Sequence, residues 1–157
     1  MAKAVNVERL QNIIGYVFKS SSLLTEALES RGHARVVSGK IDGNQRLALL
    51  GDAVLGLVQL DQWYQTQQSR GNADLLLKAR VTNRSLQECA ERLGITSEIL
   101  VAPCQEYLQG QQIGRLTSAS TVEALLGAVW LDSNKDFEQV QKVVHKLGIG
   151  EIVENGS

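Results

Sequence analysis

The chain has 157 residues, of which 43% are apolar, and a formal net charge of −1. That length predicts one domain with a sizeable core, and an aromatic content of only 4% means that aliphatic side chains must fill it. The near-zero charge excludes bulk electrostatic attraction to nucleic acid or an anionic membrane, so any RNA contact needs a local basic patch or bridging metal ions.

The compartment is predicted from what the sequence lacks. Cys89 and Cys104 are too few for a disulfide framework or a zinc site, and we expect buried thiols in a reducing compartment. No apolar run is long enough to predict a membrane span, and the first residues lack the apolar core of a signal peptide. An early Glu8 also disfavours a mitochondrial presequence. We expect an intracellular protein of the cytoplasm, nucleus or mitochondrion, not secreted and without membrane contact.

The first part of the chain predicts two short helices and a loop. Asn6 is expected to cap a first helix that Gly15 ends, and three serines at positions 20–22 precede a second one. Residues 30–43 contain three glycines and four basic residues with little apolar periodicity, which predicts a loop.

The longest predicted helix runs from Asn44 to about Gln68, where apolar residues recur at helical spacing. Gly51 and Gly56 lie inside it, and because a mid-helix glycine costs about 1 kcal/mol relative to alanine, we expect another segment to pack very closely there. Further helices are expected over residues 72–94, 117–132 and 136–147. The sequence thus predicts an all-α domain of six to eight helices over residues 1–150, followed by a disordered tail at 151–157.

Two of these helices carry single acidic residues where a metal-dependent nuclease would need pairs. Positions 48 and 52 lie one helical turn apart, but they hold Ala48 and Asp52. Positions 120 and 123 also share a helical face, but they hold Ser120 and Glu123. A carboxylate at each position would form half of a site for a hard divalent cation, so two half-sites are each half empty.

These segments resemble the two signature segments of the ribonuclease III family. Residues 44–55 (NQRLALLGDAVL) match eight or nine of the twelve positions in the family pattern N-E-R-L-E-F-L-G-D-[SA]-[VI]-L. Residues 120–132 (STVEALLGAVWLD) resemble D-x-[FVI]-E-A-L-[IL]-G-A-[IV]-[YFW]-L-D. Segments 9–18 and 83–94 resemble other family patterns in the same order, so the resemblance covers roughly residues 7–147.

The resemblance implies an all-helical catalytic domain that pairs as a homodimer and binds double-stranded RNA in a valley. In the family, four carboxylates per subunit hold magnesium, which activates a water for phosphodiester hydrolysis. They map onto positions 48, 52, 120 and 123, which leaves Asp52 and Glu123 as the catalytic and metal-binding candidates. Two further family acids map onto Gln45 and Asn72. Because alanine has no donor atom and serine is a weak ligand for magnesium, we expect weak or absent metal binding.

Other site residues are expected at an RNA surface and at a dimer interface. Arg31, Arg35, Lys40, Arg80 and Arg84 are candidates for contacts with RNA phosphates, with solvated basic faces as the alternative. Leu49 stands where the family has an aromatic plug for the partner subunit, and we expect the dimer interface at Leu49, Gly51 and Leu55. Arg46 is an alternative partner for Glu123.

The leading hypothesis is a catalytically deficient, dimeric RNA-binding or ribonucleoprotein scaffold. A homodimer is favoured, and a heterodimer with an active paralogue stays open. The family's usual double-stranded-RNA-binding module is not recognised in this sequence, so a partner would supply part of the RNA affinity. One alternative is an active endoribonuclease that uses magnesium or manganese at a reduced site. Another is a protein-interaction module without an RNA role. An inactive domain is expected to need no cofactor.

Overall fold

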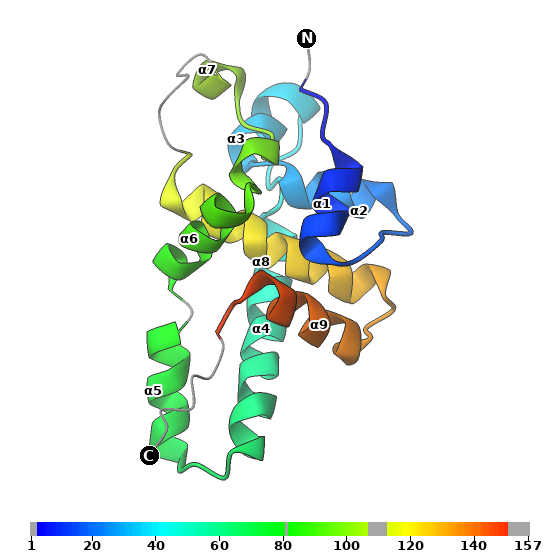
Figure 1. The fold of residues 1–157 in the computed structure, drawn as a ribbon. Helices are drawn as coiled ribbons and strands as arrows, with labels where there is room; N and C mark the ends of the chain where they lie inside the picture. Colours follow the sequence, from blue (N-terminus) through cyan, green and yellow to red (C-terminus); the bar gives the residue numbers. More distant parts are fainter. Residues whose placement is uncertain (1–2, 81, 107–112, 151–157) are drawn as a thin grey trace.

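The computed structural model describes residues 3–80, 82–106 and 113–150, and it describes their side chains except at 76–80 and 105–106. The described residues form helices and no strand, apart from an isolated bridge between Glu29 and Leu100. The elements in chain order are α1 (Val7–Ile14), α2 (Ser21–Leu28), α3 (Arg31–His33), the π-helical turn η1 (Ala34–Ser38), α4 (Gln45–Gln65), α5 (Arg70–Arg80), α6 (Asn83–Leu93), the 3₁₀ turn η2 (Thr96–Glu98), α7 (Pro103–Glu106), α8 (Arg115–Asp132) and α9 (Phe137–Leu147) (Figure 1). The all-α prediction is confirmed.

Local capping explains several of the helix ends. The Asn6 side chain accepts a hydrogen bond from the backbone of Arg9 and starts α1, and Gly15 ends it in the left-handed conformation with a φ of 75°. Asp136 caps α9 in the same way as Asn6 caps α1. These ends agree with the sequence prediction because side-chain caps act over only three residues.

Two predictions about the elements are corrected. The single helix expected over residues 72–94 is two helices, since Thr82 accepts a hydrogen bond from the backbone of Ser85 and starts α6 anew. The loop expected over residues 30–43 contains α3 and η1, because the Ser30 hydroxyl accepts from the backbone of His33 and caps a helical turn.

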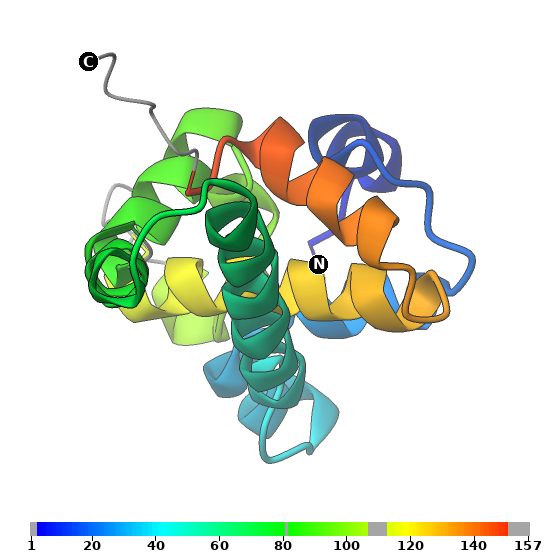
Figure 2. The same ribbon diagram turned by 90° about the horizontal axis from the view of Figure 1, so that it is seen from below.

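Helix α8 passes through the middle of the molecule, and α4 crosses it (Figures 1 and 2). The two backbones touch at this crossing: a Cβ atom added to Gly51 would overlap the carbonyl oxygen of Glu123, and one added to Gly127 would overlap the carbonyl oxygen of Leu47. The close packing predicted at Gly51 is therefore confirmed. The same prediction of close packing is wrong for Gly56, where an added Cβ would meet nothing within 4 Å.

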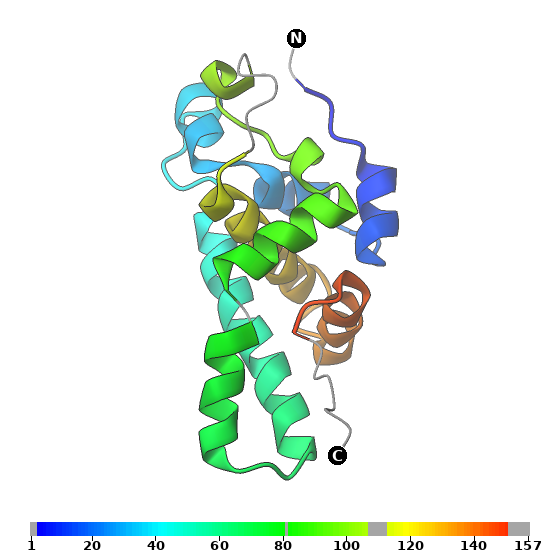
Figure 3. The same cartoon turned by 60° about the vertical axis from the view of Figure 1, so that its left-hand side comes forward.

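Helices α2, α6 and α9 pack on α8 around this crossing, and their buried residues form one aliphatic core. The C-terminal half of α4 and α5 form a hairpin that extends away from the rest of the molecule (Figures 1 and 3). Cys89 lies in the core at 4% exposure, as expected, but Cys104 is exposed, so the expectation of two buried thiols is wrong for Cys104. No helix among the described residues is long and apolar enough to cross a membrane. The predicted tail at 151–157 lies outside them.

Candidate functional site

The crossing of α4 and α8 brings the two signature segments together. Gly51 contacts the backbone of Glu123, and Asp52 follows Gly51 directly, so the two acidic residues come from the same point of contact. Asp52 is exposed and Glu123 is partly buried at the edge of the core. Ala48 is only 4% exposed, so the position that would hold a third acid is part of the core packing.

Asn44, the first residue of the N-terminal signature segment, stabilises this crossing through hydrogen bonds. Its side-chain amide donates to the carbonyl oxygen of Ala27 at 3.0 Å and to the hydroxyl of Thr121 at 3.2 Å. Its backbone N–H donates to the carbonyl oxygen of Glu29 at 2.8 Å, and the residue is only 1% exposed. From the sequence, Asn44 is predicted only to start the long helix. The side chain does not cap α4 but joins α2 and α8 across many intervening residues, which no local pattern indicates.

The final acid of the C-terminal signature, Asp132, has a structural role that sequence analysis also missed. Its carboxylate accepts hydrogen bonds from the Tyr16 hydroxyl and from the backbone N–H groups of Lys19 and Ser20, each at 2.8 Å. Partial burial acts to raise the pKa of Asp132, but these hydrogen bonds outweigh it and lower the pKa below the usual value. Asp132 therefore anchors the segment that leads into α2 at the end of α8.

The pKa of Glu123 is perturbed in the opposite direction. Burial, with the nearby negative charge of Asp52 as a second cause, raises the pKa of its carboxyl to about 7. Within the described part of the chain Glu123 has no ion-pair partner, and the expected alternative pairing with Arg46 is not formed. Asp52 and Glu123 are therefore close enough for their charges to interact, and neither forms an ion pair within the described residues.

The donor atoms at this site do not fit a four-carboxylate metal centre. No cluster of three or more His, Cys, Asp or Glu residues that could hold a metal ion occurs in the described residues. Ala48 offers no donor and Ser120 only a neutral hydroxyl. Gln45 donates its side-chain amide to the Asn44 side chain at 3.2 Å, and Asn72 lies in α5, on the hairpin. What remains is a pair of carboxyl groups, Asp52 and Glu123, and the pKa of Glu123 is raised to about 7.

The comparisons with known proteins identify the family. Residues 20–151 match a family model described as "Ribonuclease-III-like". The chain belongs to the ribonuclease III-like family. It is similar to Ribonuclease 3 of Thermobifida fusca, with 36% identity over 143 residues, covering 90% of this chain and 58% of the relative. It is also similar to Ribonuclease 3 of Streptomyces coelicolor, with 36% identity over 140 residues, covering 88% of this chain and 49% of the relative.

A solved structure shows the same fold. The nuclease domain of ribonuclease III from Campylobacter jejuni, described for flexibility in its dimer-forming region, superimposes with a TM-score of 0.78 at 28% identity. That likeness covers 90% of this chain and 95% of the other chain. This chain spans about half the length of the curated relatives named above.

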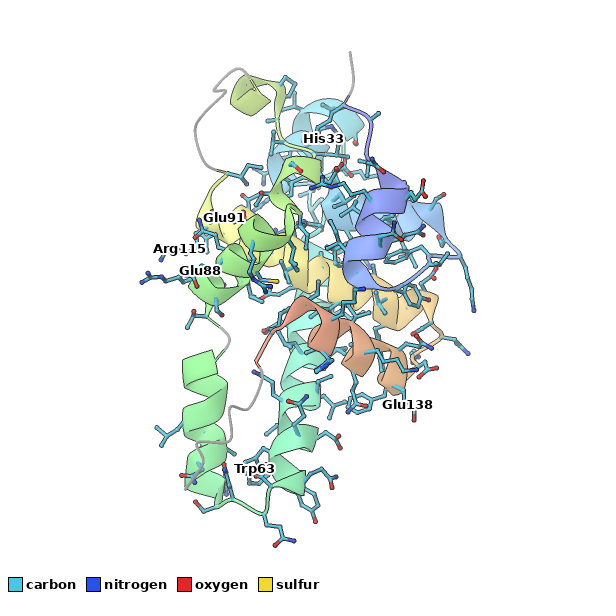
Figure 4. All side chains as sticks on the ribbon, viewed as in Figure 1. His33, Trp63, Glu88, Glu91, Arg115 and Glu138 are labelled. Carbon is cyan, nitrogen blue, oxygen red and sulfur yellow. The ribbon has the colours of Figure 1, made fainter. Side chains whose placement is uncertain are left out.

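In this ribonuclease III-like domain the predicted RNA-contacting cations are divided between two surfaces. Arg31, Arg35 and Lys40 are exposed around α3 and η1, at the opposite end of the molecule from the tip of the α4–α5 hairpin (Figure 1). Arg84 is exposed on α6, where its side chain forms an ion pair with Glu88 at 3.1 Å. Figure 4 shows this separation through His33 of α3 and Glu88 of α6. The Arg80 side chain lies outside the described residues.

The residues predicted at the dimer interface differ in their exposure to solvent. Leu49 is 76% exposed and remains available to a partner. The prediction of an interface position is corrected for Gly51 and Leu55. Gly51 contacts α8 of the same chain, and Leu55 is 1% exposed. An apolar helix face predicts burial, but it does not say whether the covering segment belongs to the same chain.

Proposed function

We propose that this chain is a ribonuclease III-type domain that recognises double-stranded RNA, alone or within a ribonucleoprotein, without cleaving it efficiently, and that it acts as a dimeric scaffold. The observation that carries the proposal is the donor set at the α4–α8 crossing. The family's four acidic positions are filled here by Ala48, Asp52, Ser120 and Glu123. Two of them therefore supply no negative charge.

The surroundings of Glu123 also disfavour its negative charge. Burial, with the nearby charge of Asp52 as a second cause, raises the pKa of its carboxyl to about 7. Magnesium gives up its waters only to strong oxygen donors such as carboxylates and phosphates. A site that offers only the carboxyl groups of Asp52 and Glu123 is therefore a poor magnesium site, and manganese would meet the same shortage of charge.

The outer face of α4 supports the dimeric part of the proposal. Leu49, Leu57, Leu60 and Tyr64 recur at helical spacing and are 76%, 49%, 39% and 73% exposed. Ala53 continues the same face between them and is exposed as well. A stripe of apolar side chains this long is typical of a surface that a partner covers. A second copy of the chain is the proposed partner, and an active paralogue with complete acids is the alternative.

The charge distribution limits how this domain contacts RNA. The net charge of −1 provides no general attraction, so affinity rests on local cations and falls with salt. Outside the α3–η1 surface, Arg84 is the predicted cation whose side chain is described, and it is the proposed contact with RNA phosphates. The cations around α3 and η1 share their surface with exposed aliphatic residues.

The test is cleavage of long double-stranded RNA by the purified chain in magnesium and, separately, in manganese. We expect no cleavage by the wild type in either metal, and retention of the RNA in a gel-shift assay at low salt. The variants Ser120→Asp and Ala48→Glu/Ser120→Asp restore carboxylates to the site. Either should gain metal-dependent cleavage or metal binding measured by calorimetry, with circular dichroism to check folding because Ala48 is buried.

Two results would overturn parts of this proposal. Cleavage by the wild type that is abolished by Asp52→Asn and also by Glu123→Gln would show an active endoribonuclease that works with two acids. This is the main competing function, because Asp52 and Glu123 lie close together. Absence of RNA binding at low salt, with a folded dimer, would leave a protein-interaction module.

A further inference from the structure

The strongest unexplained surface is the stretch from α3 through η1 to Ile41, here called the 31–41 loop. Three of its aliphatic side chains point into solvent: Val36, Val37 and Ile41 are 68%, 56% and 70% exposed. Isolated exposed aliphatic residues are ordinary, but three within six consecutive residues are not. Nothing in the described part of the chain covers them.

A buried carboxylate joins the two ends of the helical part of the loop. Glu29 is 4% exposed and accepts a hydrogen bond from the Ser38 hydroxyl, while His33 Nδ1 lies 3.0 Å from its Oε1. Burial acts to raise the pKa of Glu29, but the hydrogen bonds from Ser38 and His33 outweigh it and lower the pKa. The base of the loop is therefore an ionised, well-bonded anchor, and the exposed aliphatic residues are presented by an ordered structure.

Further contacts join this anchor to the core. Ala34 is fully buried, and the backbone N–H of Ser30 donates to the carbonyl oxygen of Leu100 at 3.0 Å. At the other end, the backbone N–H of Lys40 donates to the carbonyl oxygen of Ala34 at 3.0 Å. A preorganised surface loses little conformational entropy when it binds a ligand.

The exposed charges within the loop are positive. Arg31, Arg35 and Lys40 are exposed and residues 31–41 contain no Asp or Glu, while the buried Glu29 attracts Lys40 and the exposed Asp42 follows the loop. The complementary ligand therefore combines negative charge with apolar groups. Double-stranded RNA supplies the charge, but across its minor groove it presents phosphates and 2′-hydroxyls, which make no use of aliphatic side chains.

We propose that the 31–41 loop is a docking surface for an acidic segment of another protein, in which aliphatic side chains are interspersed with carboxylates. The carboxylates of that segment pair with Arg35 and Lys40, and its aliphatic groups cover Val36 and Ile41. This surface is made of other residues than the α4 face, Asp52 and Glu123. The proposal stands whether or not the domain cleaves or binds RNA.

The test uses the full chain and an array of synthetic acidic peptides in which Leu or Ile occurs at every second, third or fourth position. These spacings sample strand and helix periodicities. Matched peptides with Ser in place of the aliphatic residues, or Lys in place of the acidic ones, serve as ligand controls. Binding of the best peptides is then measured by fluorescence anisotropy at low and moderate salt.

Two loop variants separate the contributions. Val36→Ser/Ile41→Ser removes the aliphatic side chains, and Arg35→Glu/Lys40→Glu reverses the charges. Each should weaken binding of the acidic aliphatic peptides at least tenfold. Val17→Ser, at a valine that is 73% exposed elsewhere, and Lys142→Glu on α9 are matched controls that should bind as the wild type does. Circular dichroism verifies that each variant is folded.

Other outcomes contradict the proposal. No binding by any acidic aliphatic peptide, or binding that the loop variants do not change, would refute it. Loss of RNA binding in the charge-reversal variant, with the aliphatic variant unaffected and no peptide bound, would make the loop a phosphate-contacting surface. Binding to vesicles of anionic phosphatidylglycerol that depends on Val36 and Ile41, without peptide binding, would make it a membrane-contacting surface.

Discussion

At Glu123 two physical effects act in the same direction. The side chain lies at the edge of the core, between the fully buried Val122 and Ala124, and faces the carboxylate of Asp52. Loss of hydration and repulsion by a like charge both disfavour its ionised form. The residue therefore lowers the stability of the fold at neutral pH, which is a recognised cost of keeping acids together in a site.

This cost predicts a pH-dependent effect of Glu123→Gln. The pKa of about 7 in the folded protein lies above the usual value of 4.5, so the folded state holds the proton more tightly than the unfolded state. The wild type is therefore relatively stable below about pH 4.5 and loses stability as the pH rises toward 7. At pH 8 the variant should have a free energy of unfolding about 1–3 kcal/mol higher than the wild type, and at pH 4 nearly the same. Urea unfolding at both pH values measures it.

The control for this prediction is Glu91→Gln, at an exposed position on α6. It should change the free energy of unfolding little at either pH. An equal effect of Glu123→Gln at pH 4 and pH 8 would contradict the proposed cause. Asp52→Asn should lower the pKa of Glu123 in an NMR titration, because it removes one of the two causes of the shift.

At the scale of the elements, the α4–α8 crossing depends on glycines at two positions. An added methyl group at Gly51 or Gly127 would meet backbone atoms, which cannot move aside as a flexible side chain can. The helices would have to separate, and the contacts of Asn44 with Thr121 would be strained. Gly56 lies in the same helix as Gly51 but has open space around it.

This difference gives a matched pair of substitutions. Gly51→Ala should destabilise the fold by about 3 kcal/mol or more through overpacking. Gly56→Ala should stabilise it by about 0.5–1 kcal/mol, because alanine restricts the unfolded chain and favours the helix. Thermal and urea unfolding measure both. A neutral Gly51→Ala would contradict the backbone contact, while a Gly56→Ala variant that folds well but loses dimerisation would place Gly56 at the interface.

The sequence predicted what depends on local pattern and missed what depends on distant contacts. The caps at Asn6 and Asp136 were predictable because their hydrogen bonds span three residues. The family resemblance predicted that Asp52 and Glu123 lie together. The roles of Asn44 and Glu29 were not predictable, since their partners come from other elements. Gly51 was expected to be close to another helix, but only the structure shows that this helix is α8 of the same chain.

At the scale of the whole molecule, the α4–α5 hairpin extends away from the other helices (Figure 3), and Leu49, Leu57, Leu60 and Tyr64 of α4 are exposed. The apolar side chains of this stripe lie on the same helix as Asp52, so a partner on this face would sit beside Asp52. The 31–41 loop lies at the end of the molecule opposite the tip of the hairpin (Figure 1).

The proposed dimer predicts a concentration-dependent association that Leu49→Asp weakens. Leu49 is 76% exposed in the single chain, so the change should leave the folded subunit intact. Within an interface it removes a buried leucine and introduces a carboxylate, at a cost of about 2 kcal/mol or more, which corresponds to roughly a thirtyfold higher dimer Kd. Analytical ultracentrifugation over a range of concentrations measures the association. Val17→Asp, at a valine that is 73% exposed away from α4, is the control that should dimerise normally. A wild type that stays monomeric at every concentration would exclude the homodimer. A mixture with a catalytically complete paralogue would then test whether the α4 face pairs with that chain instead.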